Sequence, residues 1–137
     1  MITIKGIEQA EQVIGNWSPR DLATIESMVL RTDPELCGSS LILETLFQPR
    51  ADSWPNFEEA MFRVTISFDA VKGLRLKEFG GGPVQIMGFD IHFVGDRGME
   101  GINYEVEDYE DDRIHFVCRG VSVLSVTREE NGFRGRV

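Results

Sequence analysis

The sequence predicts an α+β protein, mostly an antiparallel β meander of six to eight strands with a short N-terminal helix packed on it. Three observations point to this fold class. Apolar and polar residues alternate with a period of two through several segments after residue 38. Glycine, proline and aspartate separate these segments by short turns, which favour antiparallel pairing because parallel strands need a long crossover. Only one stretch, near the N-terminus, has the clear apolar spacing of an α-helix.

The first expected element is a short amphipathic helix over residues 6 to 15. Its apolar residues recur at helical spacing at Ile7, Ala10, Val13 and Ile14. Glu8 and Glu11 lie on the opposite side, and Gly15 is typical of a residue that ends a helix.

The segment from residue 18 to residue 31 fits two structures. Ser18, Pro19 and Asp21 are typical of a helix start. The apolar residues that follow also suit a strand that ends at the turn formed by Asp33 and Pro34. Local pattern alone leaves both alternatives open.

The remaining elements are strands. They are expected in SLILETLF, FRVTISFD, LRLKEF, QIMGFDIHF, INYEVED, RIHFVCRG and VSVLSV. RADSWPNF is expected to be a loop, and the run Gly80 to Pro83 a turn or bulge. Residues on single strand faces form the expected core, namely Phe62, Val64, Ile66, Phe68, Phe89, Ile91, Ile114 and Phe116.

Length and composition bound the class of protein. The 137 residues suit one domain, residues 1–137, with a core that needs no metal or disulfide. No apolar run approaches the ~20 residues of a membrane-spanning helix, and no leader peptide is recognised, so we expect a cytoplasmic protein. The net charge of −9 opposes binding to nucleic acid or to an anionic membrane.

The acidic residues concentrate in the sequence MEGINYEVEDYEDD, from Met99 to Asp112, which contains no lysine or arginine. A solvated, solubilising face is the simpler interpretation of this run. The alternative is an electrostatic docking surface for a cationic partner. The partner-binding residues would then be Glu105, Glu107, Asp108, Glu110, Asp111 and Asp112.

No catalytic or metal-binding motif is recognisable. Cys37 and Cys118 are far apart, and the only histidines are His92 and His115, so neither a zinc site nor any other cofactor is expected. His92 lies two residues from Asp90 and could form half of a general-base pair, although no activated nucleophile is evident. A small-ligand-binding β-barrel or an enzyme with a site around His92 and Asp90 is therefore the alternative to a protein-binding function, and an accessory interaction domain is a third possibility.

The order of segments resembles the immunity protein 50 family of bacterial polymorphic toxin systems. The stretch NWSPRDLA, residues 16–23, is similar to the family's tryptophan, proline and acidic-alanine step, with Arg20 where the family has a histidine. FDAVKGLRLKEFGGG with VQIMGFDI looks like its strand pair, and IHFVCRGVSVLSV like its closing hairpin. The resemblance implies a strand from Leu22 to Arg31. It also implies a cytoplasmic immunity protein that is not an enzyme and that neutralises a cognate toxin domain, which we expect to be basic.

Overall fold

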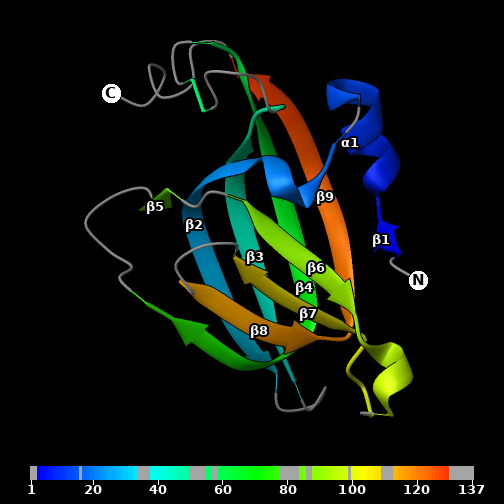
Figure 1. Cartoon of the computed structure of the whole chain (residues 1–137). Coiled ribbons are helices and arrows are strands. Elements are labelled where there is room, and N and C mark those ends of the chain that lie inside the picture. Colours follow the sequence, from blue (N-terminus) through cyan, green and yellow to red (C-terminus); the bar gives the residue numbers. More distant parts are fainter. Residues whose placement is uncertain are drawn as a thin grey trace.

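The computed structural model describes residues 3–15, 17–33, 38–49, 55–56, 59–77, 84–85, 88–98, 100–108 and 113–129. These residues form nine strands, one α-helix and two short 3₁₀ helices (Figure 1). The helical elements are α1 (Ile7–Ile14), η1 (Pro19–Asp21) and η2 (Gly95–Arg97). The strands are β1 (Ile4–Lys5), β2 (Leu22–Asp33), β3 (Gly38–Phe47), β4 (Met61–Leu76), β5 (Val84–Gln85), β6 (Phe89–Phe93), β7 (Tyr104–Asp108), β8 (Ile114–Cys118) and β9 (Gly120–Glu129).

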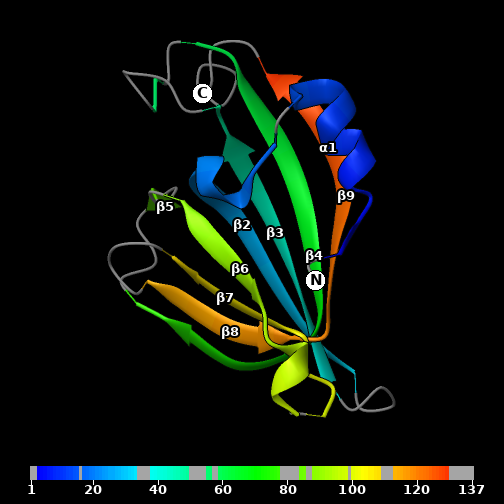
Figure 2. The ribbon, with the colours of Figure 1, turned by 45° about the vertical axis from the view of Figure 1, so that its right-hand side comes forward.

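The strands form one curled sheet, and the predicted fold class is confirmed. The hydrogen-bonded order is β5-β2-β3-β4-β8-β7-β6, with β9 also on β4 and β1 on β9. All pairs are antiparallel except β1 with β9. Figure 2 shows the two halves of the sheet diverging, with β2, β3, β4 and β9 in one half and β6, β7 and β8 in the other.

The corner of the sheet is the long strand β4. Its first part pairs with β9, beginning with Met61 opposite Glu129. Its last part pairs with β8, ending with Leu76 opposite Ile114. The strand bends where Ala70 and Gly73 have positive φ angles of 52° and 65°. A simple meander would pair each strand only with its sequence neighbours, and β4 departs from that pattern.

The expected closing hairpin in IHFVCRGVSVLSV is not formed. Strands β8 and β9 follow one another along the same edge of β4, with only Arg119 between them. The backbone N–H of Arg119 donates to the carbonyl of Asp69 (2.9 Å), which keeps the junction on β4. A Cβ at Gly120 would lie 2.3 Å from Oδ1 of the exposed Asp69 side chain, which would have to turn away to accommodate it.

The N-terminal segment covers the open side between the two halves. Helix α1 packs beside β9 and confirms the expected helix, although Val13 is 43% exposed while Ala10 is fully buried. The hydroxyl of Tyr104 on β7 accepts from Thr3 N (3.0 Å) and donates to Thr3 O (3.1 Å). Residues 22–33 are a strand, as the family resemblance implied.

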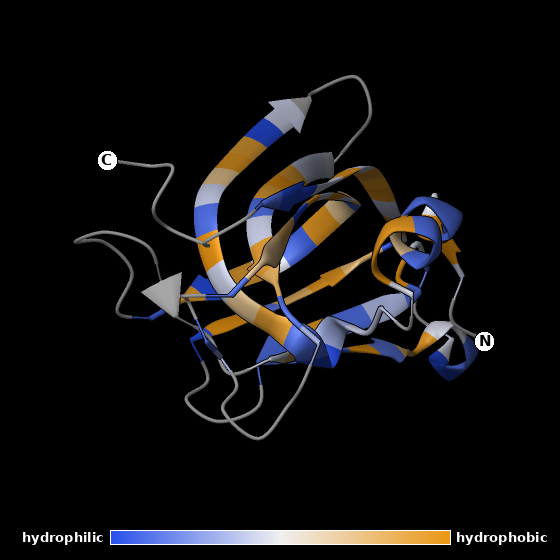
Figure 3. Ribbon diagram, turned by 90° about the horizontal axis from the view of Figure 1, so that it is seen from above, coloured by the Kyte–Doolittle hydropathy of each residue, from blue (hydrophilic) through white to orange (hydrophobic). Residues whose placement is uncertain are grey.

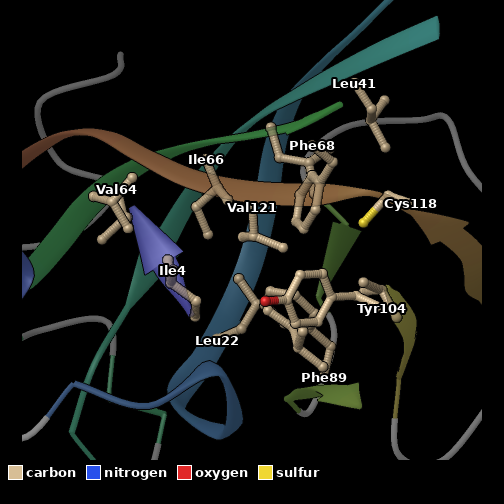
Figure 4. Packing of buried hydrophobic residues seen from close by; sticks show 14 of the residues in the cluster. Ile4, Leu22, Leu41, Val64, Ile66, Phe68, Phe89, Tyr104, Cys118 and Val121 are labelled. Carbon is tan, nitrogen blue, oxygen red and sulfur yellow. The ribbon is translucent and has the colours of Figure 1, made fainter. Parts of the chain in front are cut away.

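The core lies between the halves of the sheet. Figure 3 shows hydrophobic and hydrophilic bands alternating along the strands, and Figure 4 shows side chains from both halves meeting in the interior. Seven of the eight expected core residues are buried there. Phe62 is the exception and is only partly buried. It lies at the start of β4, directly after the buried Met61.

Cys118 is fully buried on β8, as its strand position predicted, and Cys37 lies outside the described residues. Burial raises the pKa of the Cys118 thiol to about 12, and the nearby negative charge of Asp69 adds to the effect. In a Cys37→Ser variant Cys118 is the only thiol, and the thiolate is the form that reacts. Cys118 of this variant should therefore react with iodoacetamide about a thousandfold more slowly in the native protein than in the protein unfolded in urea. Labelling of the native protein at the rate of a free thiol would contradict the buried position.

The folded state holds the proton of the Cys118 thiol more tightly than the unfolded state does. The free energy of unfolding should therefore fall as pH rises from 9.0 toward about 12.

Candidate functional site

The acidic strand β7 has two different faces. Tyr104, Val106 and Asp108 are buried on the inner face, whereas Glu105 and Glu107 lie on the outer face and are partly exposed. Strands β6 and β8 flank β7 on its two sides. Glu105 and Glu107 therefore lie on the outer face formed by β6, β7 and β8.

Asp108 does not belong to this outer face, contrary to its assignment as a docking residue. Its side chain is buried, and Oδ1 accepts a hydrogen bond from the backbone N–H of Ile114 at 3.0 Å. The carboxylate therefore ties the end of β7 to the start of β8. The other three acidic residues assigned to docking, Glu110, Asp111 and Asp112, lie outside the described residues.

The strand register brings both histidines onto the same outer face. Glu105 is opposite His92, and Glu107 is opposite both His115 and Asp90. Each imidazole, however, contacts the glutamate diagonal to it and not the one directly opposite. His115 Nε2 lies 3.1 Å from Glu105 Oε2, and His92 Nε2 lies 3.3 Å from Glu107 Oε1. His92 is 3.9 Å from Asp90, so Glu107 is its closer partner.

We name these five side chains the outer-face cluster: Asp90, His92, Glu105, Glu107 and His115. Within it, Glu105, Glu107 and His115 offer ligand atoms that all lie within 4.8 Å of one another. His92 and Glu107 are each 44% exposed, whereas the His115 side chain is only 18% exposed. On the β4 side, Arg75 is the register partner of His115 and places a cation at the border of the cluster.

A pocket of about 300 Å³ lies at the seam between the N-terminal segment and β6. Most of its lining is apolar, and Arg20 and Asp90 are its ionisable lining residues. Asp90 therefore lines the pocket and also belongs to the outer-face cluster. The volume is at the small end of the range of ligand sites, about 300 to 1,000 Å³.

A second charged group surrounds Arg63 on the sheet half formed by β2, β3, β4 and β9. Its guanidinium contacts Glu26 (2.6 Å), Glu44 (3.5 Å) and Glu129, the last through two atoms at 2.6 and 3.2 Å. The Glu26 side chain is 6% exposed. Its burial raises the pKa of the Glu26 carboxyl, although Arg63 opposes the effect.

No protein-family model, curated protein or solved structure matches this chain. No helix in the described part of the chain is long and apolar enough to cross a bilayer. Cys118 lies on the inner face of β8 and His115 on the outer face, so these two residues do not form a nucleophile-base pair.

Proposed function

We propose that the protein binds and neutralises a basic protein domain, in the manner of a bacterial immunity protein, through the outer face of β6, β7 and β8. One observation carries the proposal. Between Asp90 and Asp112 nine residues are acidic and Arg97 is the only lysine or arginine, so this segment holds most of the net charge of −9. Three of these carboxylates, those of Asp90, Glu105 and Glu107, stand on one sheet face.

A face of this kind suits an inhibitor of a nucleic-acid-directed toxin. Such a toxin must present a positive surface to its substrate, and a negative face can cover that surface without any chemistry. Complementary fields raise association rates toward ~10⁸ to 10⁹ M⁻¹s⁻¹ at low salt. The antiparallel ladders of β6, β7 and β8 hold the carboxylates in place before the partner arrives. Little ordering of the face is then needed on binding.

The pocket beside Asp90 favours a second candidate function, the binding of a small, mainly apolar ligand. Its lining includes Ile4, Ile7 and Ile91, with Asp90 and Arg20 as charged groups. The two candidates differ in which substitution impairs function. Filling the pocket with Ile7→Trp should abolish ligand binding, while reversing the charges of Glu105 and Glu107 should leave it intact.

The docking proposal is tested with a basic toxin domain that acts on nucleic acid, sought among the products of the genes that neighbour this one. Co-expression of the wild-type chain should restore growth of a host that produces this domain. Replacing Glu105 and Glu107 together by lysine should slow association at least tenfold, with a much smaller change in dissociation, because steering acts on the encounter. Wild-type association should also slow with added salt. Rates are measured by surface plasmon resonance in buffer containing EDTA.

The matched control carries the same charge change elsewhere. Glu8 and Glu11 are both exposed on α1, and Glu8→Lys/Glu11→Lys should associate at a rate close to that of the wild type. Thermal melts establish that each variant is folded. A folded Glu105→Lys/Glu107→Lys protein that associates at the wild-type rate would exclude this face as the interface. If the wild type neither protects the host nor forms a complex, neutralisation of this domain is excluded.

A further inference from the structure

We propose that the outer-face cluster binds a divalent transition-metal ion, with Zn²⁺ as the expected ion. The ligands are Glu105, Glu107 and His115. His92, which lies 3.3 Å from Glu107, is the proposed fourth ligand. Glu105 and Glu107 serve in both proposals, but metal binding rests only on what these side chains can coordinate, and its test needs no toxin. The expectation that the chain has no metal site considered only ligands clustered in sequence, whereas these ligands come together across three strands.

The donor atoms already lie at separations close to those around a metal ion. A tetrahedral zinc site with bonds of about 2.0 to 2.2 Å places neighbouring ligand atoms about 3.3 to 3.6 Å apart. His115 Nε2 and Glu105 Oε2 are 3.1 Å apart, and His92 Nε2 and Glu107 Oε1 are 3.3 Å apart. The ligand atoms of Glu105, Glu107 and His115 all lie within 4.8 Å of one another, so an ion among them requires these side chains to draw closer together.

The backbone fixes where these donors lie. Glu105 and Glu107 are two residues apart on the central strand β7, so both side chains project from the same face. His92 comes from β6 and His115 from β8, and each is held in register by the ladder on its side. Nδ1 of His115 is buried, so Nε2 is the ring nitrogen that is turned toward the glutamates. The cluster is therefore assembled by the fold before any ion binds.

The donor types select the class of ion. Calcium and magnesium prefer oxygen ligands alone, whereas two imidazoles with carboxylates suit Zn²⁺ and its transition-metal neighbours. The three carboxylates of Asp90, Glu105 and Glu107 repel one another on a shared face, and a divalent cation would offset that repulsion. His92 and Glu107 are each 44% exposed, so solvent reaches the site and the ion can enter from outside.

The test uses the full chain, freed of metal with EDTA and dialysed. Calorimetric titration with Zn²⁺ near neutral pH should show one saturable site, and Zn²⁺ should raise the midpoint of thermal unfolding because it binds only the folded cluster. Co²⁺ should give visible absorption bands of a site with nitrogen and oxygen ligands and no thiolate charge-transfer band. A Cys37→Ser variant with unchanged affinity would show that this thiol is not a ligand.

Substitutions within the cluster should weaken Zn²⁺ binding selectively. His115→Gln and Glu107→Gln should each lower the affinity by at least about tenfold, since loss of even an outer-shell partner of a metal ligand costs about 10- to 100-fold. The matched control, Asp96→Asn/Glu100→Gln, removes two exposed carboxylates outside the cluster and should bind like the wild type. Far-ultraviolet circular dichroism identifies any variant that fails to fold. His92→Gln provides a third ligand variant, at a side chain that is 44% exposed. The proposal is wrong if the wild type shows no saturable binding, or if the folded ligand variants retain its affinity.

Discussion

Replacing Phe89 by alanine should lower the free energy of unfolding by about 3 to 5 kcal/mol, enough to unfold many domains of this size. Phe89 begins β6 and is only 1% exposed. The centroid of its ring lies 6.3 Å from that of Phe47 on β3, in the other half of the sheet. The Phe47 ring in turn lies 5.3 Å from that of Trp17, with the two rings tilted by 52°. Truncation would thus open a cavity where both halves and the N-terminal segment meet. Urea denaturation followed by tryptophan fluorescence measures the change.

The same strand provides the control for this prediction. Phe93 ends β6, has the same strand parity as Phe89 and is 36% exposed. Phe93→Ala should therefore cost clearly less than Phe89→Ala, since less apolar surface returns to water. Equal costs for the two variants, or an unchanged midpoint for Phe89→Ala, would show that β6 does not pack into the core as described.

Replacing Arg63 by methionine should destabilise the protein by about 3 to 5 kcal/mol, the usual cost of leaving a buried charge without its partner. Arg63 contacts three glutamates, and the Glu26 side chain is almost wholly buried. Without the guanidinium, these carboxylates would repel one another. Arg31→Met is the control, because Arg31 is exposed on β2, and its effect should stay within about 0.5 kcal/mol.

The pH dependence of the Arg63→Met variant distinguishes lost charge from lost packing. The raised pKa of Glu26 means that the folded state holds this proton more tightly than the unfolded state. Ionisation of Glu26 therefore destabilises the fold as pH rises from below 4.5 through the raised pKa, and more so without Arg63. The deficit of Arg63→Met should be smallest in acid and grow toward neutral pH, and Glu26→Gln should partly rescue it. A deficit that is independent of pH and of Glu26 would show that Arg63 acts by packing alone.

Much of the fold follows from local pattern. Period-two alternation placed the strands around Phe68, Ile91 and Phe116 and identified their buried faces, and helical spacing placed α1. The bend of β4 could not be predicted in this way. It depends on Ala70 adopting a positive φ, which is unusual for a residue with a Cβ and leaves no mark in composition. The continuous pairing of β8 and β9 along β4 is a long-range property that local alternation does not encode.

The candidate site was predictable only in part. Alternation in β7 placed Glu105 and Glu107 on the outer face, and the same parity rule assigns Asp108 to the inner face with Tyr104 and Val106. Asp108 was nevertheless assigned to the docking surface because it lies within the run of acidic residues. The convergence of His92 and His115 on the glutamates depends on the register of three strands, because a shift of one residue would turn either imidazole to the opposite face.

The closing of the open side by the N-terminal segment has a consequence for synthesis on the ribosome. Gln9 of α1 donates its side-chain N–H to the carbonyl of Val123, 114 residues later in the chain. At about 5 to 20 residues per second, translation leaves α1 without this partner for roughly 6 to 23 seconds. Strands β2, β3 and β4 pair with sequence neighbours and can fold in that interval. Ala10 and Ile14 of α1 can pack into the core only after β9 has been synthesised. The first elements to emerge are thus among the last to dock, and the core stays open until β9 has been made.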